Sequence, residues 1–247
     1  MKRLFNLLTS CIIIPVAGLA QEGTWTLSAG AGYAIISLGA VKADMERDVG
    51  TYNEAGFGLP PFPSPSPGIA LTAAASYRFD RDYSFSINAH HDTRTVETSW
   101  SNQEDDISLK RRIKATVVSA GVVHHFPGTL DTDIFVEVEV GILFARATSY
   151  AYWTHTEKLF DSTSTEVLGD TRGVFERSKM IASVGAGGSV RLFGPMFLRG
   201  KLLYRVGQLG KIDGSITKFG QTMDQTTTIE FNFSGFLILA SIGIELS

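Results

Sequence analysis

The feature that most constrains the fold of this chain is a strict alternation of side-chain character. Between residues 134 and 142 the sequence is Ile-Phe-Val-Glu-Val-Glu-Val-Gly-Ile, with apolar residues at every second position and Glu137 and Glu139 in two of the gaps. Because side chains of a β-strand point alternately to opposite faces, one face is apolar and the other carries two carboxylates. The carboxylates would face water in a soluble sandwich but a lumen in a membrane barrel.

The same alternation recurs in eight segments along the chain. These segments hold about ten residues or more, whereas strands in soluble sandwiches commonly have five or six. Strands of this length can span a bilayer at the usual tilt. The segments are residues 24–35, 69–79, 83–90, 113–126, 134–144, 180–192, 198–206 and 229–246.

Two of the segments need a decision about which face is which. In the fourth segment we place Ile113 on the apolar outer face and Lys114 inside. In the last segment Phe231 and Phe233 start on the apolar face, and the apolar positions then change phase at residues 234–235. An extra residue in one strand produces such a shift, so the sequence predicts a β-bulge there.

The connections between the segments alternate between short and long, and this decides for a membrane barrel. Transmembrane barrels have short periplasmic turns and long extracellular loops, and the chain enters from the periplasmic side. The short connections are residues 79–83, 127–133 and 193–196, and the long ones are residues 37–67, 98–112, 147–173 and 210–227.

Aromatic residues gather near both ends of the segments. Two aromatic girdles at the membrane interfaces are expected of an outer-membrane barrel. Near the short connections lie Trp25, Phe79, Tyr83, Phe85, Phe126, Phe193 and Phe197, and near the long ones lie Trp100, Tyr150, Tyr152, Trp153, Phe175 and Tyr204.

This pattern resembles the small outer-membrane β-barrel proteins of Gram-negative bacteria, which include the OmpA transmembrane domain, OmpX, OmpW and the opacity-type surface antigens. The resemblance covers nearly the whole chain after the N-terminal segment and is architectural. It implies an all-β fold, an eight-stranded antiparallel up-and-down transmembrane barrel. It also implies outer-membrane lipid, lipopolysaccharide and the barrel-assembly machinery as partners. The chain departs from the family in ending with Leu246-Ser247 instead of an aromatic residue.

The N-terminal segment predicts export. Lys2 and Arg3 precede a mostly apolar run, and Gly18-Leu19-Ala20 offers a small-x-small cleavage site. We expect residues 1–20 to be a cleaved signal peptide and residues 21–247 to form the barrel domain in the outer membrane. The only cysteine, Cys11, lies in the signal, so the mature chain would hold no disulfide. A net charge of −3 gives no indication of nucleic-acid binding.

The inward positions of the segments are charged. An isolated charge in a narrow lumen is costly, and pairing with an opposite charge offsets that cost. We expect Glu137 and Glu139 to lie level with Arg199 and Lys201. Such a network either plugs the lumen or acts as a gate whose pairs exchange. Its members are Arg78, Lys114, Glu137, Glu139, Arg191, Arg199, Lys201, Arg205 and Glu230.

Two histidine pairs raise the question of catalysis or metal binding. The pairs are His90-His91 and His124-His125. Neighbouring strand residues point to opposite faces, so each pair supplies one histidine to each side. The sequence shows no nucleophile placed with them and no third zinc ligand. We therefore expect no catalytic residues, no metal and no cofactor.

Two of the long connections carry apolar and aromatic side chains. The first contains Phe57 and Phe62 in a proline-rich stretch that cannot pair as a strand. The third contains Tyr150, Tyr152 and Trp153 among hydroxyl residues. Aromatic side chains with small hydroxyls form adaptable contact surfaces. These five residues are either a surface for an external ligand or, in part, an interfacial girdle.

The sequence favours a non-enzymatic surface protein whose barrel anchors exposed loops for envelope stability or external binding and adhesion. The alternative is a narrow channel or carrier for ions or small amphipathic solutes. A third hypothesis, a lipid A-modifying enzyme, has less support because no nucleophile accompanies the histidines.

Overall fold

The computed structural model describes residues 23–36, 39–63, 67–126, 131–159, 162–226 and 231–246. The expected signal peptide and Glu230 lie outside these ranges. One helix, α2 (Gly39–Glu54), accompanies the strands β1 (Thr24–Ile36), β2 (Gly68–Arg78), β3 (Tyr83–Ser101), β4 (Asp105–Phe126), β5 (Thr132–Leu159), β6 (Ser162–Phe193), β7 (Met196–Val206), β8 (Gln208–Gly210), β9 (Asp213–Lys218), β10 (Gln221–Thr226), β11 (Phe231–Asn232) and β12 (Gly235–Leu246).

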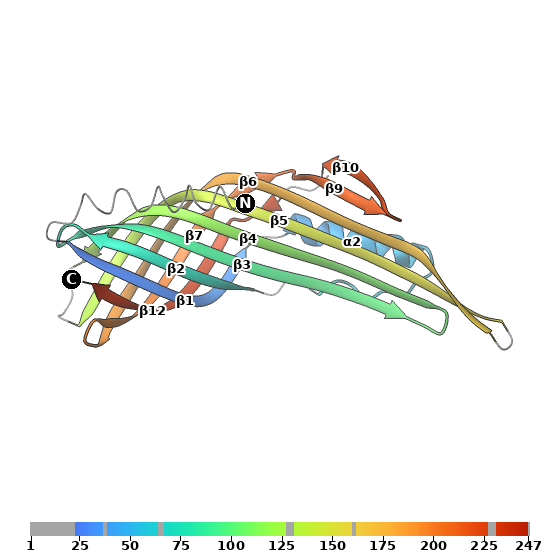
Figure 1. The fold of residues 1–247 in the computed structure, drawn as a ribbon, viewed down its shortest axis with the longest axis horizontal. Helices are drawn as coiled ribbons and strands as arrows, with labels where there is room; N and C mark the ends of the chain where they lie inside the picture. The colour runs from blue at the N-terminus through green and yellow to red at the C-terminus, as the bar shows by residue number, and fades with distance from the viewer. Residues whose placement is uncertain are drawn as a thin grey trace.

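Eight of these strands close into an antiparallel ring (Figure 1). The order runs from β6 through β5, β4, β3, β2 and β1 to β12 and β7, and pairing of β6 with β7 closes the ring. The turns β2–β3, β4–β5 and β6–β7 lie together at one end, the short-turn end, with Trp25 opposite Leu246 in register. The predicted eight-stranded up-and-down barrel is confirmed.

The faces of most strands agree with the alternation in the sequence. On β5 the side chains of Val136, Val138 and Val140 are exposed, whereas Glu137 and Glu139 are buried inside the ring. The predicted change of phase at residues 234–235 is not found, because Phe231 and Phe233 are buried on the same inward parity as Leu237 and Leu239. The strand is instead interrupted between Asn232 and Gly235, where Gly235 has a φ of 155°.

The fourth segment faces the other way from our prediction. Ile113, Ala115 and Val117 are buried inside, and Lys114 is exposed on the outer face. Between residues 117 and 123 both faces of β4 carry valines, so alternation alone could not separate the two faces. Phe231 and Phe233 were also placed wrongly, because both are buried in the interior.

Two of the predicted long loops are instead continuations of the strands. β3 and β4 extend to Ser101 and Asp105, and β5 and β6 extend to Leu159 and Ser162. Beyond the register row Arg94–Ile113–Ala147–Phe175 these four strands leave the ring and form what we call the projecting sheet, with β9 and β10 added beside β6. The β5 part alone reaches about 40 Å at about 3.3 Å per residue.

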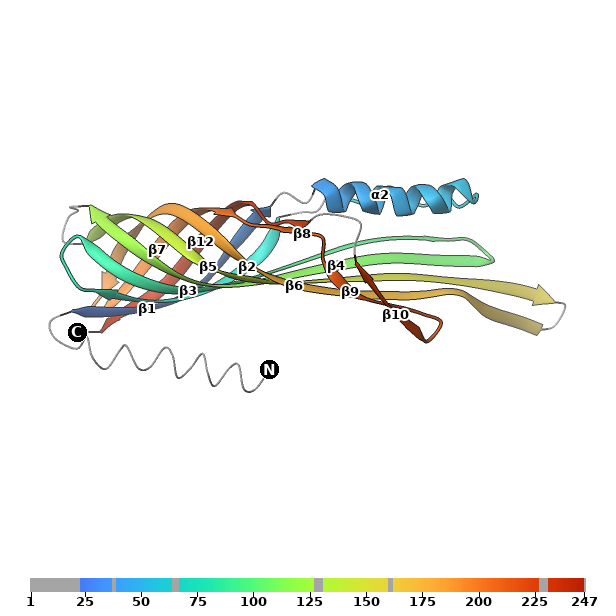
Figure 2. The same ribbon diagram turned by 90° about the horizontal axis from the view of Figure 1, so that it is seen from above.

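The first long connection folds mainly into α2, which lies over the projecting sheet (Figure 2). Val41, Met45 and Val49 recur at every fourth position, so they share one helix face. All three are buried in one apolar cluster with Leu59 and Phe62. A helix was not expected here, although this spacing is the signal that could have predicted it.

An apolar belt surrounds the ring. The outward residues of β5 are exposed and apolar from Ile134 to Phe144, and Arg146 follows. At about 3.3 Å per residue and a tilt of about 40°, this stretch gives a height of about 25 Å, as in outer-membrane barrels. In the described ranges no helix is long and apolar enough to cross a membrane.

The aromatic girdles are confirmed in part. Phe79, Tyr83, Phe85, Phe126 and Phe193 are exposed near the short-turn end, and Tyr150, Tyr152 and Tyr204 are exposed beyond or near the other edge of the belt. The remaining assignments are wrong in part, since Phe197 and Phe175 are buried and Trp100 and Trp153 pack against the apolar cluster.

Candidate functional site

The centre of the lumen is a lysine held between two glutamates. The Nζ atom of Lys201 on β7 lies 2.8 Å from Glu137 Oε2 and 3.0 Å from Glu139 Oε1 on β5. The side chains are 9%, 3% and 1% exposed, respectively. Two carboxylates buried this deeply need the ammonium between them, so the three side chains act as one unit. The predicted proximity of Lys201 to both glutamates is confirmed.

Polar side chains satisfy the remaining carboxylate oxygens. Ser86 Oγ and Asn88 Nδ2 donate to Glu137 Oε1 over 2.6 and 2.9 Å. Ser119 Oγ donates to Glu139 Oε2 over 2.7 Å. His90 Nε2 lies 3.7 Å from the same oxygen. Hydrogen bonds of this kind make a buried charge tolerable, so the network rigidly fills the lumen.

A second ion pair joins β3 to β7. Arg205 Nη1 lies 3.5 Å from Asp92 Oδ2, and the two side chains are 1% and 3% exposed. Arg94, two residues along β3, donates to the backbone oxygen of Ala34. Arg205 was expected in the network, whereas Asp92 was not, because its segment was thought to end at residue 90.

Apolar side chains occupy the other end of the ring interior. The cluster beneath α2 includes Leu143, Leu203, Leu237 and Leu239, which point inward from β5, β7 and β12. Charged and apolar side chains therefore fill the ring one above the other. The predicted polar lumen is only half of what the ring contains.

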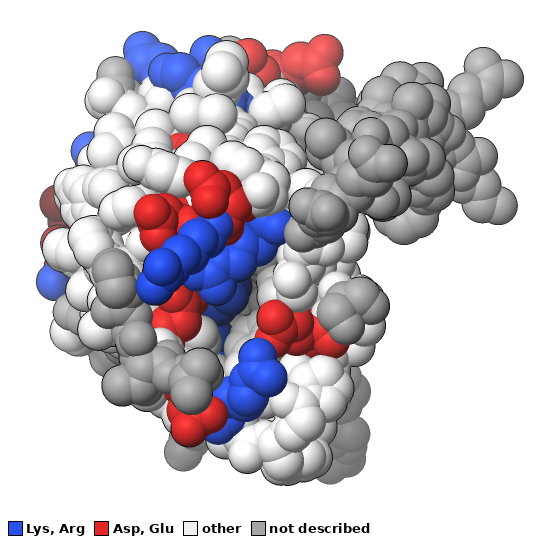
Figure 3. All heavy atoms as spheres, turned by 90° about the vertical axis from the view of Figure 1, so that its left-hand side faces the viewer, with Lys and Arg blue, Asp and Glu red and all other residues white. Residues whose placement is uncertain are grey.

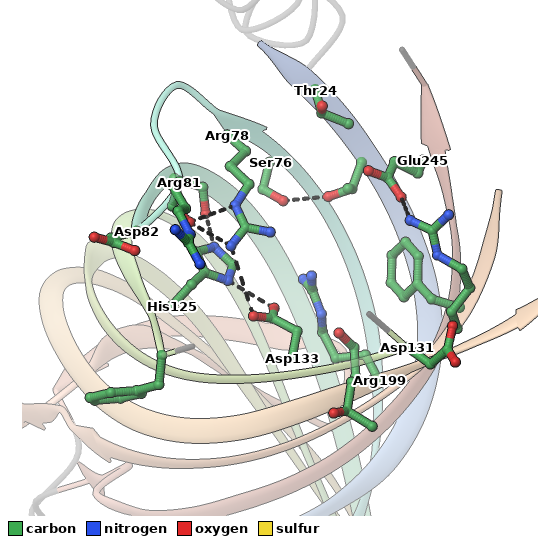
Figure 4. A pocket seen from close by; sticks show the side chains of 17 residues that line it. Thr24, Ser76, Arg78, Arg81, Asp82, His125, Asp131, Asp133, Arg199 and Glu245 are labelled. Carbon is green, nitrogen blue, oxygen red and sulfur yellow. Dashed lines mark hydrogen bonds and ion pairs between the residues drawn. The ribbon is translucent and has the colours of Figure 1, made fainter. Parts of the chain in front are cut away.

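The short-turn end opens into a cavity of about 240 Å³. Viewed from this end, Lys and Arg side chains gather in the central hollow with Asp and Glu around them (Figure 3). Arg191 pairs with Glu245 at 2.6 Å, and Arg78 Nη2 lies 3.9 Å from Asp133. Arg78 and Arg191 thus line this cavity, whose lining does not include Glu137 or Glu139. Figure 4 shows Arg78 beside Asp133.

Arg199 is held by aromatic rings. Its guanidinium carbon lies 5.0 Å from the ring centre of Phe135 and 5.1 Å from that of Phe197, which is a cation–π arrangement. Among the described residues no ion pair joins Arg199 to a carboxylate, and its buried Nε has no hydrogen-bond partner. Arg199 therefore points a charged group into the cavity, and Lys201 alone pairs with Glu137.

Three side chains in this cavity form a continuous hydrogen-bonded chain. Ser84 Oγ lies 2.8 Å from His125 Nε2, and His125 Nδ1 lies 2.8 Å from Asp133 Oδ2. The sequence did not show a hydroxyl side chain beside the histidines, whereas the structure places Ser84 next to His125. The residues come from β3, β4 and β5, so only the strand register brings them together.

Lys114 belongs to a row of charges on the outer face. It lies opposite Arg146 on β5, which in turn lies opposite Glu176 on β6 and pairs with it at 3.2 Å. Arg112 follows as the next outward residue of β4 and is exposed. No ion pair joins Arg112 or Lys114 to a carboxylate in the described part of the chain. The row stands directly above the apolar belt.

The predicted contact surface is divided between the inside and the outside. Phe57 packs edge-on against Trp100 and Trp153, with ring centres 5.4 and 5.1 Å apart, and Phe62 is buried. Tyr150 and Tyr152 are exposed on the outer face, with Arg172 stacked on Tyr150. The apolar members stabilise the projecting sheet and the tyrosines face outward.

The far part of the projecting sheet is joined by a small polar clasp. Trp153 Nε1 and His155 Nδ1 both lie within hydrogen-bond distance of Asp105 Oδ1, at 3.1 and 2.9 Å. The bonds from Trp153 and His155 lower the pKa of Asp105, and the bond to Asp105 raises the pKa of His155. The clasp links the start of β4 to β5.

A second cavity of about 250 Å³ lies between α2 and the projecting sheet. Arg111 on β4 reaches across to α2, with its two terminal nitrogens 2.6 Å from Asp44 and 2.6 Å from Asp48. The acidic residues of this connection therefore hold the helix in place on the sheet.

No protein-family profile matches this chain, and no curated protein sequence matches it. Solved structures with the same architecture include a major outer membrane protein from Thermus thermophilus, with a TM-score of 0.50, 8% identity and coverage of 92% of this chain and 100% of that chain. The outer membrane protein OprG from Pseudomonas aeruginosa gives a TM-score of 0.50 at 11% identity, covering 92% and 97%. Neisserial surface protein A gives 0.43 at 14%, covering 90% and 95%.

Structural matches at such low sequence identity show the fold and carry no information about the activity. Together with the closed ring, the outward apolar belt and the short turns at one end, they define the class. The chain has the fold of the small outer-membrane β-barrel proteins of bacteria.

Proposed function

We propose that this protein is an outer-membrane surface protein whose closed barrel anchors the projecting sheet for external binding or envelope stability. The observation that carries the proposal is the filling of the ring by Lys201, Glu137 and Glu139 and by the apolar cluster beyond them. A barrel filled in this way is suited to anchoring instead of conduction.

The design of the projecting sheet supports the same role. Its strands continue far beyond the length needed to cross a bilayer, and α2 covers it with an apolar cluster that continues into the ring. Long polar loops would suffice for a barrel without an external task. A rigid sheet held by the Arg111 ion pairs keeps its outer surface in one shape for a partner.

Conductance in planar bilayers separates this role from that of a narrow channel. We expect the purified protein to give no steady single-channel steps. Steady steps in the wild-type protein that disappear on charge reversal at Glu137 or Arg199 would favour the channel and contradict the proposal. A low conductance that both reversals leave unchanged would count as leak at the protein–lipid boundary.

Labelling of intact cells tests which end is external. Glu166→Cys places a thiol on the exposed part of β6 in the projecting sheet, and Asp82→Cys places one at the short-turn end. A membrane-impermeant maleimide should label the first variant on intact cells and the second only after the outer membrane is opened. Labelling in the reverse order would show that the orientation is wrong.

We also propose that the outward row at Arg112 and Lys114 contacts phosphate groups of outer-leaflet lipid such as lipopolysaccharide. Both cations are exposed, neither pairs with a described carboxylate, and both stand where the apolar belt ends. That is the height of lipid headgroups. Insertion by the barrel-assembly machinery is part of the same proposal.

Binding of purified lipid A to the protein in phosphatidylcholine nanodiscs tests the lipid contact. Removing both cations in Arg112→Gln/Lys114→Gln should weaken binding by about fivefold per charge. The matched control is Lys42→Gln/Arg47→Gln on α2, which removes the same charge away from the belt. Equal weakening of lipid A binding in both variants would rule out a lipid site at this row. So would inorganic phosphate that competes as well as lipid A does.

A further inference from the structure

The short-turn cavity contains a hydrogen-bonded serine, histidine and aspartate, which the proposed surface role does not require. We infer that Ser84, His125 and Asp133 form a nucleophile–base–carboxylate chain that hydrolyses small carboxylic esters entering the cavity from the short-turn side. The inference goes beyond the proposed function, and each stands or falls without the other.

The hydrogen bonds place each group in its role. Asp133 is a carboxylate and accepts from His125 Nδ1 over 2.8 Å, so this nitrogen carries the proton. His125 Nε2 is then the free base and accepts the Ser84 hydroxyl over 2.8 Å. Both distances suit a nucleophile activated by a base that a third group orients.

The barrel wall fixes this geometry. Ser84 and His125 are buried inward residues near the ends of adjacent strands, with Tyr83 and His124 in register beside them. The backbone nitrogen of His125 also donates to the Asp82 oxygen over 2.7 Å. Side chains on paired strands are held more precisely than those on loops, which favours preorganised chemistry.

The cavity supplies the other parts that acyl transfer requires. Ser84, His125 and Asp133 all line it, together with Arg78, Phe197 and Arg199. Arg199 lines it from between two aromatic rings, with no ion pair to a described carboxylate, so we assign its guanidinium as the positive charge that faces the oxyanion (Figure 4). Phe197 offers an apolar wall to an acyl chain.

The size and access of the cavity set the substrate class. A volume of about 240 Å³ is below the usual range for drug-sized ligands, so only a small ester fits. Lys201 and the glutamates close the deeper lumen. The substrate therefore enters and the products leave by the same mouth.

The reaction is an acyl transfer to serine followed by hydrolysis. Ser84 Oγ attacks the ester carbonyl carbon while its proton passes to His125 Nε2, and the carbonyl oxygen becomes an oxyanion. The ester C–O bond then breaks, and the alcohol leaves with the proton from His125. Water then attacks the carbonyl carbon of the acyl-serine while its proton passes to His125 Nε2. The bond between this carbon and Ser84 Oγ breaks, His125 returns the proton to Ser84 Oγ, and the carboxylic acid leaves.

The alternative is that the same bonds merely satisfy buried polar groups. The two cases differ in the reactivity of Ser84. An idle serine hydroxyl does not react with an organophosphorus fluoride, whereas a serine activated by a base is phosphorylated.

The experiment treats the folded protein in detergent micelles with diisopropyl fluorophosphate and locates the modified residue by mass spectrometry. We expect modification at Ser84 that heat unfolding abolishes. Hydrolysis of p-nitrophenyl acetate should be lost with Ser84→Ala and fall about 100-fold or more with His125→Gln. Asp133→Asn, which alters a positioning residue, should also shift the pH profile of the rate. The matched control is His124→Gln, on the opposite face of β4, which should leave both readouts unchanged.

Folding of every variant is checked by heat-modifiable migration in gels. Should His125→Gln fail to fold, Ser84→Cys offers a second measurement, since His125 should make its thiol react with iodoacetamide at neutral pH faster than an unfolded thiol does. A folded protein left unmodified at Ser84, or modified equally in His125→Gln, overturns the inference. So does a Ser84→Cys thiol no more reactive than in the unfolded chain.

Discussion

The two halves of the ring interior differ in kind although the same alternation builds both. Near the short turns most inward positions are polar or charged, and the buried charges there are paired with each other or stacked on Phe135 and Phe197. Toward the projecting sheet the inward positions are Leu, Ile, Val and Phe, covered by α2. The inward residues are apolar where they belong to the cluster that α2 completes, and they are mostly polar elsewhere.

The two halves also stabilise the protein in different ways. In the charged half, each group depends on a specific partner, so one substitution can leave a buried charge alone. In the apolar half, the stabilisation is spread over many contacts and falls roughly with the area lost. The comparison predicts a large effect from one lysine and a smaller, local effect from one helix residue.

The largest expected effect follows removal of the central cation. Lys201→Met leaves Glu137 and Glu139 buried without their ammonium and should lower the free energy of unfolding by about 3–5 kcal/mol. Urea unfolding from lipid vesicles measures it. The triple variant with Glu137→Gln and Glu139→Gln removes the unpaired charges and should recover most of the loss. A single variant as stable as the wild type would mean that the pairing is incidental.

A smaller effect is expected in the apolar half. Met45→Ala leaves a cavity beneath α2 and should destabilise the helix on the projecting sheet by about 2–3 kcal/mol, at the lower end for such truncations. Limited proteolysis should cut α2 faster while heat-modifiable migration of the ring is unchanged. The control is Glu46→Ala on the exposed side of the helix. If unfolding of the ring follows the loss of Met45, the two halves are not independent.

The sequence predicts the ring well because its signal is local. The exposed valines of β5 and the short turns both depend on neighbouring residues. Prediction from the sequence fails where two alternative structures have the same local pattern of residues. Ile113 and Lys114 were assigned to the wrong faces because both sides of β4 carry valines between residues 117 and 123. The extensions of β3–β6 looked like loops because many of their residues are polar.

The candidate sites depend on register, which the sequence shows only roughly. The height estimate found Lys201 beside the glutamates, whereas Arg199 stacks on Phe135 and Phe197 without a direct ion pair to a described carboxylate. Asp92 was missed because β3 is longer than expected. Ser84, His125 and Asp133 could not be linked at all, since three strands have to be aligned before they meet.

The smallest predicted effect concerns the clasp of Asp105 with Trp153 and His155, far from both halves of the ring. The raised pKa of His155 means that its contribution is complete below the ordinary value of 6.5 and is lost as the pH rises through the raised value. The lowered pKa of Asp105 means that its contribution is present above 3.8 and is lost as the pH falls through the lowered value. The clasp is therefore strongest between these two ordinary values.

Hydrogen exchange of the peptide containing residues 101–106 should then show more protection at pH 5.5 than at pH 9, after correction for intrinsic rates. Asp105→Asn should remove most of this difference, because the uncharged amide no longer favours protonated His155. Asp106→Asn on the neighbouring position is the matched control and should keep it. A difference that persists in Asp105→Asn would mean that the pH acts elsewhere. The change in exchange should be confined to the tip of the projecting sheet. The tip can open locally, whereas the ring is closed by eight paired strands and does not open with it.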